Sequence, residues 1–209
     1  MKTFYSSEFW NQGLIQLADN DYVVIDSFLP KELLNNLERK FILNENKQLF
    51  EPAKIGSAEV EKRITEIRSD YTYWLDRERD SDIVTFFEIV DELIRNCAEV
   101  LYLSLQGFEF HFARYPKGGF YKAHLDQFDS RSNRMLSMVI YLNHDWAIGD
   151  GGELRLLEPC IKTIEPLYNR AVIFRSDVVL HEVLQSNKLR RSITGWILKR
   201  PSGVDLLGL

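Results

Sequence analysis

The sequence has few of the residues that mark secreted, membrane-bound or nucleic-acid-binding proteins. Only two of its 209 residues are cysteine, Cys97 and Cys160, and they stand far apart in no metal-ligand spacing. We therefore expect no disulfide framework and interpret both as small buried hydrophobic residues. The N-terminal MKTFYSSEFW has no continuous apolar stretch, and no apolar run approaches the length of a membrane-spanning helix. These absences predict a cytoplasmic protein without a signal peptide.

An excess of positive charge is also missing. The chain has 26 Lys and Arg against 31 Asp and Glu, a net charge of −5. A chain of this charge has no general attraction to nucleic acid or anionic membranes, so we expect neither as a partner. With 45% apolar and 27% charged residues, 209 residues can bury a full core in one domain. The sequence leaves the oligomeric state open, and a monomer is compatible with it.

The hydrophobic pattern changes along the chain from helical to β-type. Apolar residues at helical spacing predict helices at 8–20, 30–47 and 80–103, and β-rich runs predict strands at 22–26 and 64–75. Short apolar runs separated by turns then predict strands at 108–115, 135–142, 153–157, 162–165, 171–175, 178–184 and 189–198. We predict one domain, residues 1–209, with a helical support of about residues 1–104 and a β-barrel or sandwich of about residues 105–200.

The polar pattern with the most chemical content is His124-Leu125-Asp126. Residues two apart in a strand point to the same side, so an imidazole and a carboxylate would lie together. The pair alone is a weak signal and needs a third ligand, for which His181 in an apolar run is the best candidate. Two histidines and one carboxylate hold non-haem Fe(II) on one face and leave positions open for a 2-oxo acid and O₂.

A dicarboxylate co-substrate would also need a cation near the metal. A polar turn at 185–188 follows His181, and a hairpin there would bring Arg190 near it. Arg190 and Arg191 fall on opposite faces of the strand that follows, and spacing alone does not choose between them. The two remaining histidines we interpret as structural (His111) and exposed (His144).

The segment from Tyr115 to Trp196 resembles the catalytic core of the prolyl 4-hydroxylase family of 2-oxoglutarate oxygenases, above all the oxygen-sensing type and its bacterial relatives. The matching pieces are Tyr115-Pro116, His124-x-Asp126, Tyr141-Leu142-Asn143-x-Asp145-Trp146, Gly151-Gly152-x-Leu154-Arg155-Leu156, Ile164-Glu165-Pro166, Phe174-x-Ser176-Asp177, His181-Glu182-Val183 and Arg190-x-x-Ile193-Thr194-x-Trp196. The resemblance extends more weakly upstream through Ile67-Arg68-Ser69-Asp70 and Trp74. The turn after Pro116 is one residue shorter than in the sensor type, a difference that bears on the substrate.

This resemblance implies a fold and a role for individual residues. The fold would be an all-β core with helices, a double-stranded β-helix (jelly-roll) barrel buttressed by N-terminal α-helices. His124, Asp126 and His181 would bind Fe(II) and, with Arg190, form the catalytic set. The resemblance selects Arg190 over Arg191 because the family's arginine stands three residues before an Ile-Thr pair. It also implies Tyr141, Tyr115, Thr194 and Trp196 around 2-oxoglutarate, and Arg68, Trp74 and Arg134 near the substrate.

The implied activity is a 2-oxoglutarate-dependent dioxygenase that hydroxylates a prolyl residue of a protein and releases succinate and CO₂. Ascorbate is a further expected cofactor. We interpret the polar residues 51–63 as a lid beside an open groove for a peptide. Two alternatives stay open: the same chemistry on a free amino acid or other small molecule, in a narrow closed pocket, or a non-catalytic module that binds 2-oxoglutarate and iron.

Overall fold

Two facing antiparallel β-sheets form the centre of the structure, a computed structural model that describes residues 2–53, 66–127 and 132–199. The helices are α1 (Ser7–Asn20), α2 (Lys31–Asn46), the short 3₁₀ helix η2 (Ser81–Ile83) and α3 (Val84–Leu101). The strands are β1 (Tyr22–Ile25), β2 (Glu51–Pro52), β3 (Tyr71–Trp74), β4 (Leu105–Tyr115), β5 (Tyr121–His124), β6 (Arg134–Tyr141), β7 (Leu154–Glu158), β8 (Lys162–Ile164), β9 (Ala171–Arg175), β10 (Leu180–Val183) and β11 (Arg190–Lys199).

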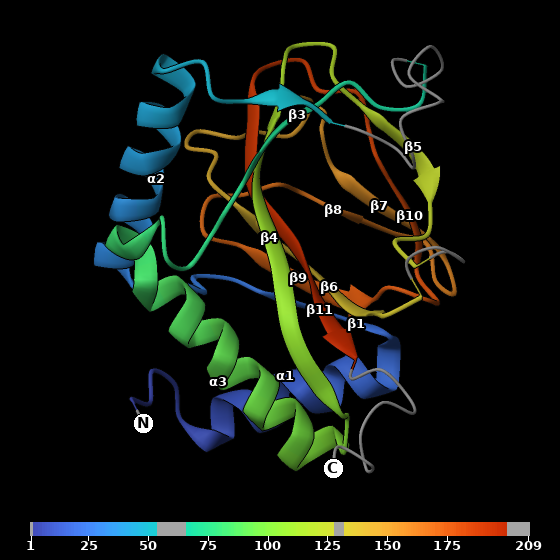
Figure 1. Cartoon of the computed structure of the whole chain (residues 1–209). Coiled ribbons are helices and arrows are strands. Elements are labelled where there is room, and N and C mark those ends of the chain that lie inside the picture. Colours follow the sequence, from blue (N-terminus) through green and yellow to red (C-terminus); the bar gives the residue numbers. More distant parts are fainter. Residues whose placement is uncertain (1, 54–65, 128–131, 200–209) are drawn as a thin grey trace.

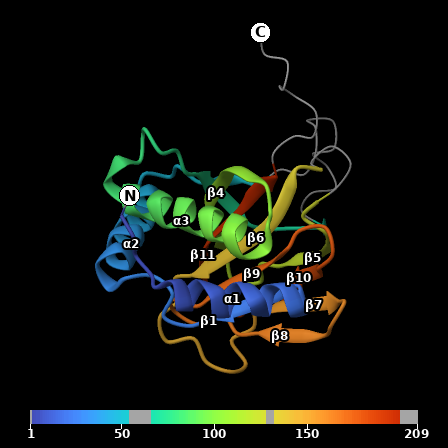
Figure 2. The ribbon, with the colours of Figure 1, turned by 90° about the horizontal axis from the view of Figure 1, so that it is seen from below.

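The chain crosses repeatedly from one sheet to the other. The larger sheet has the strand order β1-β9-β6-β11-β4-β3-β2, and the smaller sheet has the order β5-β10-β7-β8. Helices lie along the larger sheet, and the smaller sheet lies on its other side (Figures 1 and 2). This alternation between two antiparallel sheets is the jelly-roll arrangement. The predicted all-β core with supporting helices is therefore confirmed.

Strand β6 illustrates how the sequence separates the two sides of the larger sheet. Leu136, Met138 and Ile140 belong to the core that the sheet shares with the helices. Val139 and Tyr141, at the alternate positions, belong to a second core shared with the smaller sheet. Because side chains alternate along a strand, one apolar run supplies both cores, and its inward face reaches the space between the sheets.

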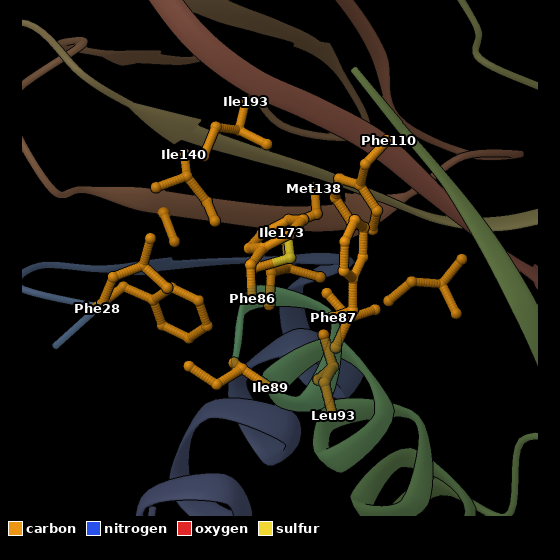
Figure 3. Close-up of a cluster of buried hydrophobic side chains, with 14 of the residues drawn as sticks. Phe28, Phe86, Phe87, Ile89, Leu93, Phe110, Met138, Ile140, Ile173 and Ile193 are labelled. Carbon is orange, nitrogen blue, oxygen red and sulfur yellow. The ribbon is translucent and has the colours of Figure 1, made fainter. Parts of the chain in front are cut away.

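Helix α3 closes the first of these cores. Phe86, Phe87 and Leu93 are almost fully buried and pack with Phe110 and Ile173 of the larger sheet (Figure 3). Their spacing repeats along one helical face, which is why the sequence pattern predicts this helix well. Truncating one of these phenylalanines to alanine would cost about 3–5 kcal/mol. The helical layer thus holds the larger sheet in place behind the site.

Several sequence predictions are confirmed with shifts of a few residues at their ends, whereas one strand is shorter than predicted and one predicted hairpin is wrong. The strand predicted at 64–75 is only four residues long, Tyr71–Trp74, within the described part of the chain. The predicted hairpin across residues 185–188 does not exist, because β10 pairs with β5 and β7 while β11 pairs with β4 and β6. Residues 184–189 cross between the sheets instead of turning within one.

The remaining structural expectations have mixed outcomes. Cys97 is buried as predicted, whereas Cys160 is half-buried. Of the predicted lid, Glu51 and Pro52 form β2 and Ala53 is buried, while residues 54–63 lie outside the described residues. Among the described helices, none has the length and apolar content needed to cross a membrane.

Candidate active site

His124, Asp126 and His181 meet at one point between the two sheets. One potential ligand atom from each lies within 4.8 Å of the others. His124 and His181 are direct partners in the β5–β10 pair, and their ring centroids are 4.3 Å apart. The strand prediction was wrong in one detail: β5 ends at His124, and Asp126 lies in a bend just after it. The bend, rather than a shared strand face, brings the carboxylate to the two imidazoles.

Hydrogen bonds fix how these groups face one another. The Nδ1–H of His124 donates to the carbonyl of Lys122 (2.7 Å), and that of His181 donates to the carbonyl of Val179 (3.0 Å). Each Nε2 is left to face Asp126, at 3.5 Å from Oδ1 for His124 and 3.6 Å from Oδ2 for His181. Backbone partners on Nδ1 are a common way to fix the tautomer of a metal-binding histidine.

The carboxylate of Asp126 is held by a further partner. The Ser137 hydroxyl on the inward face of β6 donates to Oδ2 of Asp126 at 2.6 Å, and it also lies 2.8 Å from the Ser176 hydroxyl. Burial would raise the pKa of Asp126, but His181, His124 and Ser137 together hold that pKa well below its usual range. Asp126 therefore stays charged inside the protein.

The two histidines and the carboxylate have protonation states suited to a divalent cation. Burial lowers the pKa of His181 to about 4, so this imidazole is neutral at neutral pH. Neutral imidazole and ionised carboxylate are the forms that bind metals. Across residues 2–53, 66–127 and 132–199, no other group of three His, Cys, Asp or Glu side chains converges in this way. The donor set fits a metal ion, and two imidazoles with one carboxylate are the set typical of non-haem Fe(II).

A narrow cavity of about 40 Å³ adjoins these ligands and contains the predicted cation. Arg190 is only 2% exposed, and its guanidinium lies 4.9 Å from the ring centroid of Tyr115 and 5.0 Å from that of Tyr141. Its Nε donates to the carbonyl of Gly152 at 2.8 Å. Gly152 has a positive φ of 71°, and a side chain there would press on Arg190. This glycine lets the backbone approach the guanidinium.

The buried charge of Arg190 is suited to an anionic ligand. No carboxylate in the described part of the chain forms an ion pair with Arg190, although isolated buried charges are costly. The hydroxyl oxygen of Tyr141 beside it is also buried without a hydrogen-bond partner among the described residues. Burial raises the pKa of Tyr141, which keeps its hydroxyl as a neutral donor. A buried guanidinium that has no carboxylate partner among the described residues, next to the Tyr141 hydroxyl, suits one carboxylate of a ligand such as 2-oxoglutarate.

The other predicted co-substrate residues line the same cavity. Tyr115 comes from β4, and Thr194 and Trp196 come from the face of β11 that carries Arg190. The predicted alternation of β11 is therefore confirmed. Arg191, on the other face, pairs instead with Glu45 of α2 at 2.9 Å. The structure thus brings Arg190 into the cavity and directs Arg191 to the supporting helix.

Of the three predicted substrate residues, two are arginines held by contacts within the protein. Arg68 lines the cavity, and its Nε and Nη2 donate to the two carboxylate oxygens of Asp70 at 2.7 and 2.6 Å. The Arg134 guanidinium lies 3.3 Å from the ring centroid of Trp196, and its Nη2 donates to Glu109 at 3.3 Å. Both arginines therefore help to fix the walls of the site.

Trp74, the third of these residues, is different because it is 48% exposed. Its ring centroid lies 4.9 Å from that of His111 and 6.1 Å from that of Trp196. His111 is buried and lines the cavity, whereas His144 is exposed as predicted. Trp74 therefore offers an apolar surface next to residues of the cavity wall.

Sequence reasoning missed two residues that support the site. Ser137 is the one small polar residue in the run Met135–Leu142, whose other members are apolar or aromatic, and that contrast could have identified it. Asp70 lies within a segment that the sequence singled out, two residues after Arg68, yet its pairing with that arginine was not foreseen. Ser137 supports Asp126, and Asp70 supports Arg68. Asp126 and Arg68 line the cavity, whereas Ser137 and Asp70 do not.

Comparison with known proteins agrees with this geometry. Residues 110–198 match the family model described as the 2OG-Fe(II) oxygenase superfamily. The crystal structure of a Pseudomonas putida prolyl-4-hydroxylase is 32% identical with a TM-score of 0.81, covering 92% of this chain and 100% of that one. A Trichoplax adhaerens prolyl hydroxylase, in complex with a hypoxia inducible factor peptide fragment, is 25% identical with a TM-score of 0.80, covering 92% and 90%.

A curated relative is longer than this chain. The hypoxia-inducible factor prolyl hydroxylase of Caenorhabditis elegans is 28% identical over 198 residues, which are 88% of this chain and 27% of that protein. The chain thus spans about a quarter of the length of this relative. The match with the Pseudomonas enzyme, at 32% identity, covers 100% of that chain. The chain belongs to the prolyl 4-hydroxylase family of Fe(II)- and 2-oxoglutarate-dependent oxygenases.

Proposed function

We propose that this protein is a dioxygenase that uses Fe(II) and 2-oxoglutarate to hydroxylate a prolyl residue of a protein, with release of succinate and CO₂. One observation carries the proposal: a three-residue metal site and Arg190, which forms no ion pair within the described ranges, lie in the same cavity. A metal site alone would fit many reactions. A buried cation beside it fits the second carboxylate of a 2-oxo dicarboxylate.

In this proposal His124, Asp126 and His181 hold the iron. Bound Fe(II), together with 2-oxoglutarate and O₂, supplies the oxidising power that places a hydroxyl group on the substrate carbon. The protein fixes the three ligands before binding: two backbone carbonyls hold the imidazoles, and Ser137 holds the carboxylate. Such outer contacts commonly contribute tenfold to a hundredfold to metal affinity or activity.

Arg190 and Tyr141 bind the distal carboxylate of 2-oxoglutarate. The guanidinium supplies charge and several donors, and the Tyr141 hydroxyl donates one more hydrogen bond. Tyr115, Thr194 and Trp196 complete the wall of the pocket. Because the surroundings are buried, these interactions act in a medium of low dielectric constant and are stronger than in water.

The substrate side of the proposal assigns Arg68, Trp74 and Arg134 to the region around the mouth of the cavity. Both solved relatives described above are named as prolyl hydroxylases, and the structure of one is a complex with a peptide fragment. A free amino acid would need a cation for its α-carboxylate. The second arginine of the cavity, Arg68, is already neutralised by Asp70, which favours a prolyl residue inside a peptide chain.

The alternative substrate class has one observation in its favour. As formed by the described residues, the cavity is narrow. A narrow pocket would also suit a free amino acid or another small molecule. The non-catalytic alternative has less support, since the metal ligands, Arg190 and Tyr141 are all present and oriented. The proposal also includes ascorbate as a cofactor, on the family resemblance alone. It includes a cytoplasmic location, on the low cysteine content alone.

Two measurements test the proposed function. Purified protein is incubated with Fe(II), 2-oxoglutarate and ascorbate, with a proline-containing protein extract or with free L-proline, and succinate is quantified. Substrate-dependent succinate with the extract, together with a mass gain of one oxygen on a prolyl peptide, is the expected result. The variant His181→Ala should give neither. Succinate formation with free proline only would replace the protein substrate by a small molecule, and its complete absence would favour a binding module.

A further inference from the structure

A second and larger cavity lies beside helix α2. Its volume is about 590 Å³, and it shares no lining residue with the active-site cavity. The wall is formed by one side of α2, by Leu142, Asn143, His144 and Trp146 after β6, and by Lys188, Leu189 and Arg191 around the start of β11. Cavities of about 300–1,000 Å³ are the size that holds a small organic ligand. We refer to this space as the α2 cavity.

The cations around the α2 cavity are not fully neutralised. Arg191 shares its carboxylate partner, Glu45, with Arg114, so two guanidinium groups are served by one acid. The Nε of Arg191 is buried and has no hydrogen-bond partner among the described residues. Arg39 donates to Asn35 and Asn36, and no acidic side chain in the described ranges forms an ion pair with it. Two arginines therefore face the cavity with charge left over.

The remaining charges of the lining are already satisfied. Glu38 accepts from His144 Nε2 and from the Tyr168 hydroxyl, each at 2.8 Å, so both of its oxygens are engaged. Lys188 pairs with Asp150 at 2.5 Å. The local balance of charge is positive, which suits an anionic ligand.

The rest of the lining is apolar and aromatic. Ile42 is 47% exposed on α2, although a β-branched apolar side chain gains by burial. Leu189 and Trp146 form other parts of the lining. An apolar wall with two incompletely neutralised arginines matches a molecule that has an apolar body and one negative end.

We propose that the α2 cavity binds a small carboxylate with an apolar ring or chain, its apolar body against Ile42, Trp146 and Leu189 and its carboxylate between Arg39 and Arg191. Such a ligand would differ from 2-oxoglutarate, which carries two carboxylates and no apolar body. The site is independent of the proposed oxygenase reaction. It lies next in sequence to the two co-substrate residues, because Leu142 follows Tyr141 and Arg191 follows Arg190.

Calorimetric titration tests this site, with indole-3-acetate and 4-phenylbutyrate as probes. The full chain is first loaded with Mn(II) and saturating 2-oxoglutarate, which occupy the active site. At least one probe should bind with one-to-one stoichiometry, and the neutral analogue indole-3-acetamide should bind roughly tenfold more weakly because it lacks the charge. Arg39→Gln should weaken binding of the acid probe and leave the affinity for the neutral amide unchanged.

A matched pair of variants locates the probe. Ile42→Glu should weaken binding of the acid at least about tenfold, because it places a like charge in the cavity. Leu43→Glu, at an equally exposed neighbour (50%) that does not line the cavity, should leave affinity within about twofold. Arg190→Ala should retain binding. The proposal would be overturned if neither probe bound, if the two glutamate variants lost affinity equally, or if Arg190→Ala lost binding.

Discussion

Arg190 and Arg191 are neighbours in the chain but lie on opposite sides of the larger sheet. The guanidinium of Arg190 lies beside Tyr141 in the active-site cavity without a carboxylate partner in the described part of the chain, whereas Arg191 pairs with Glu45 of α2. Strand alternation alone separates their roles. Arg190 faces the active-site cavity, whereas Arg191 attaches the sheet to its supporting helix and lines the α2 cavity.

Replacing the two arginines one at a time tests this separation. Arg190→Ala should raise the KM for 2-oxoglutarate about 10- to 100-fold, since a charge-assisted hydrogen bond contributes about 1.5–3 kcal/mol. Arg191→Ala should change that KM less than about threefold, although it removes a partly exposed ion pair worth up to about 1 kcal/mol of stability. Circular dichroism would verify folding of both. Equal effects on KM would contradict the assignment of Arg190.

The metal site predicts a clear difference between two histidines. His181→Ala should abolish both Mn(II) binding, followed by electron paramagnetic resonance, and 2-oxoglutarate turnover. The fold should persist, because the two apolar cores do not include this side chain. His144→Ala should retain both properties, since His144 is exposed and lines the α2 cavity instead. Retained metal binding by His181→Ala would mean that the site uses other ligands.

Ser137 is predicted to act through Asp126. The variant Ser137→Ala removes the 2.6 Å hydrogen bond to Oδ2 of the carboxylate and should lower metal affinity about 10- to 100-fold. Turnover at saturating metal should recover in large part, which separates a positioning role from a catalytic one. Ser104→Ala, at an exposed position before β4, is the control and should leave metal affinity unchanged. Unaltered affinity in Ser137→Ala would remove Ser137 from the site.

Local patterns predicted the elements better than their pairing. The strand Ala171–Arg175 was placed to the residue, because its apolar run and the flanking turns define it. The hairpin after His181 was wrong, since strand pairing depends on distant contacts. An isolated β-bridge between Gly151 and Ser186 joins the connection after β10 to the turn before β7, and no local sequence pattern predicts this bridge.

The candidate site was predictable to the extent that residue type determines chemistry. His124, Asp126 and His181 could be selected because few side chains bind iron, and the family resemblance then fixed the choice of Arg190. Supporting contacts were harder to foresee, since a buried Ser137 or a paired Asp70 has many ordinary roles. The α2 cavity was not foreseen at all, because a cavity arises from packing of distant segments.

His111 predicts a pH dependence of stability. Burial first, and then nearby Arg68, lowers the pKa of His111 from 6.5 to about 3 in the folded protein. Below pH 6.5 the unfolded chain binds a proton that the folded chain does not, so the stability falls as the pH drops towards 3. At pH 5 this difference amounts to about 2 kcal/mol.

Urea unfolding of the metal-free protein at pH 7 and pH 5 measures this contribution. The variant His111→Met should lose about 2 kcal/mol less stability between the two pH values than the unaltered chain. His144→Gln, which changes an exposed histidine, should keep the original difference. An unchanged pH dependence in His111→Met would show that His111 titrates alike in the folded and unfolded chains.

The last prediction concerns how the substrate reaches the cavity. Trp74 is half exposed on β3 and lies against His111 and Trp196 of the cavity wall, so it can cover the apolar ring of a prolyl residue. Trp74→Ala should raise the KM for the protein substrate about tenfold and leave the KM for 2-oxoglutarate unchanged, because Trp74 does not itself line the co-substrate cavity. Tyr71→Ala alters another exposed aromatic residue on the same strand, three residues away, and should change neither constant. Parallel assays with free L-proline complete the test. If Trp74→Ala lowers turnover of free proline as strongly as turnover of protein, the tryptophan shapes the pocket and does not bind a peptide.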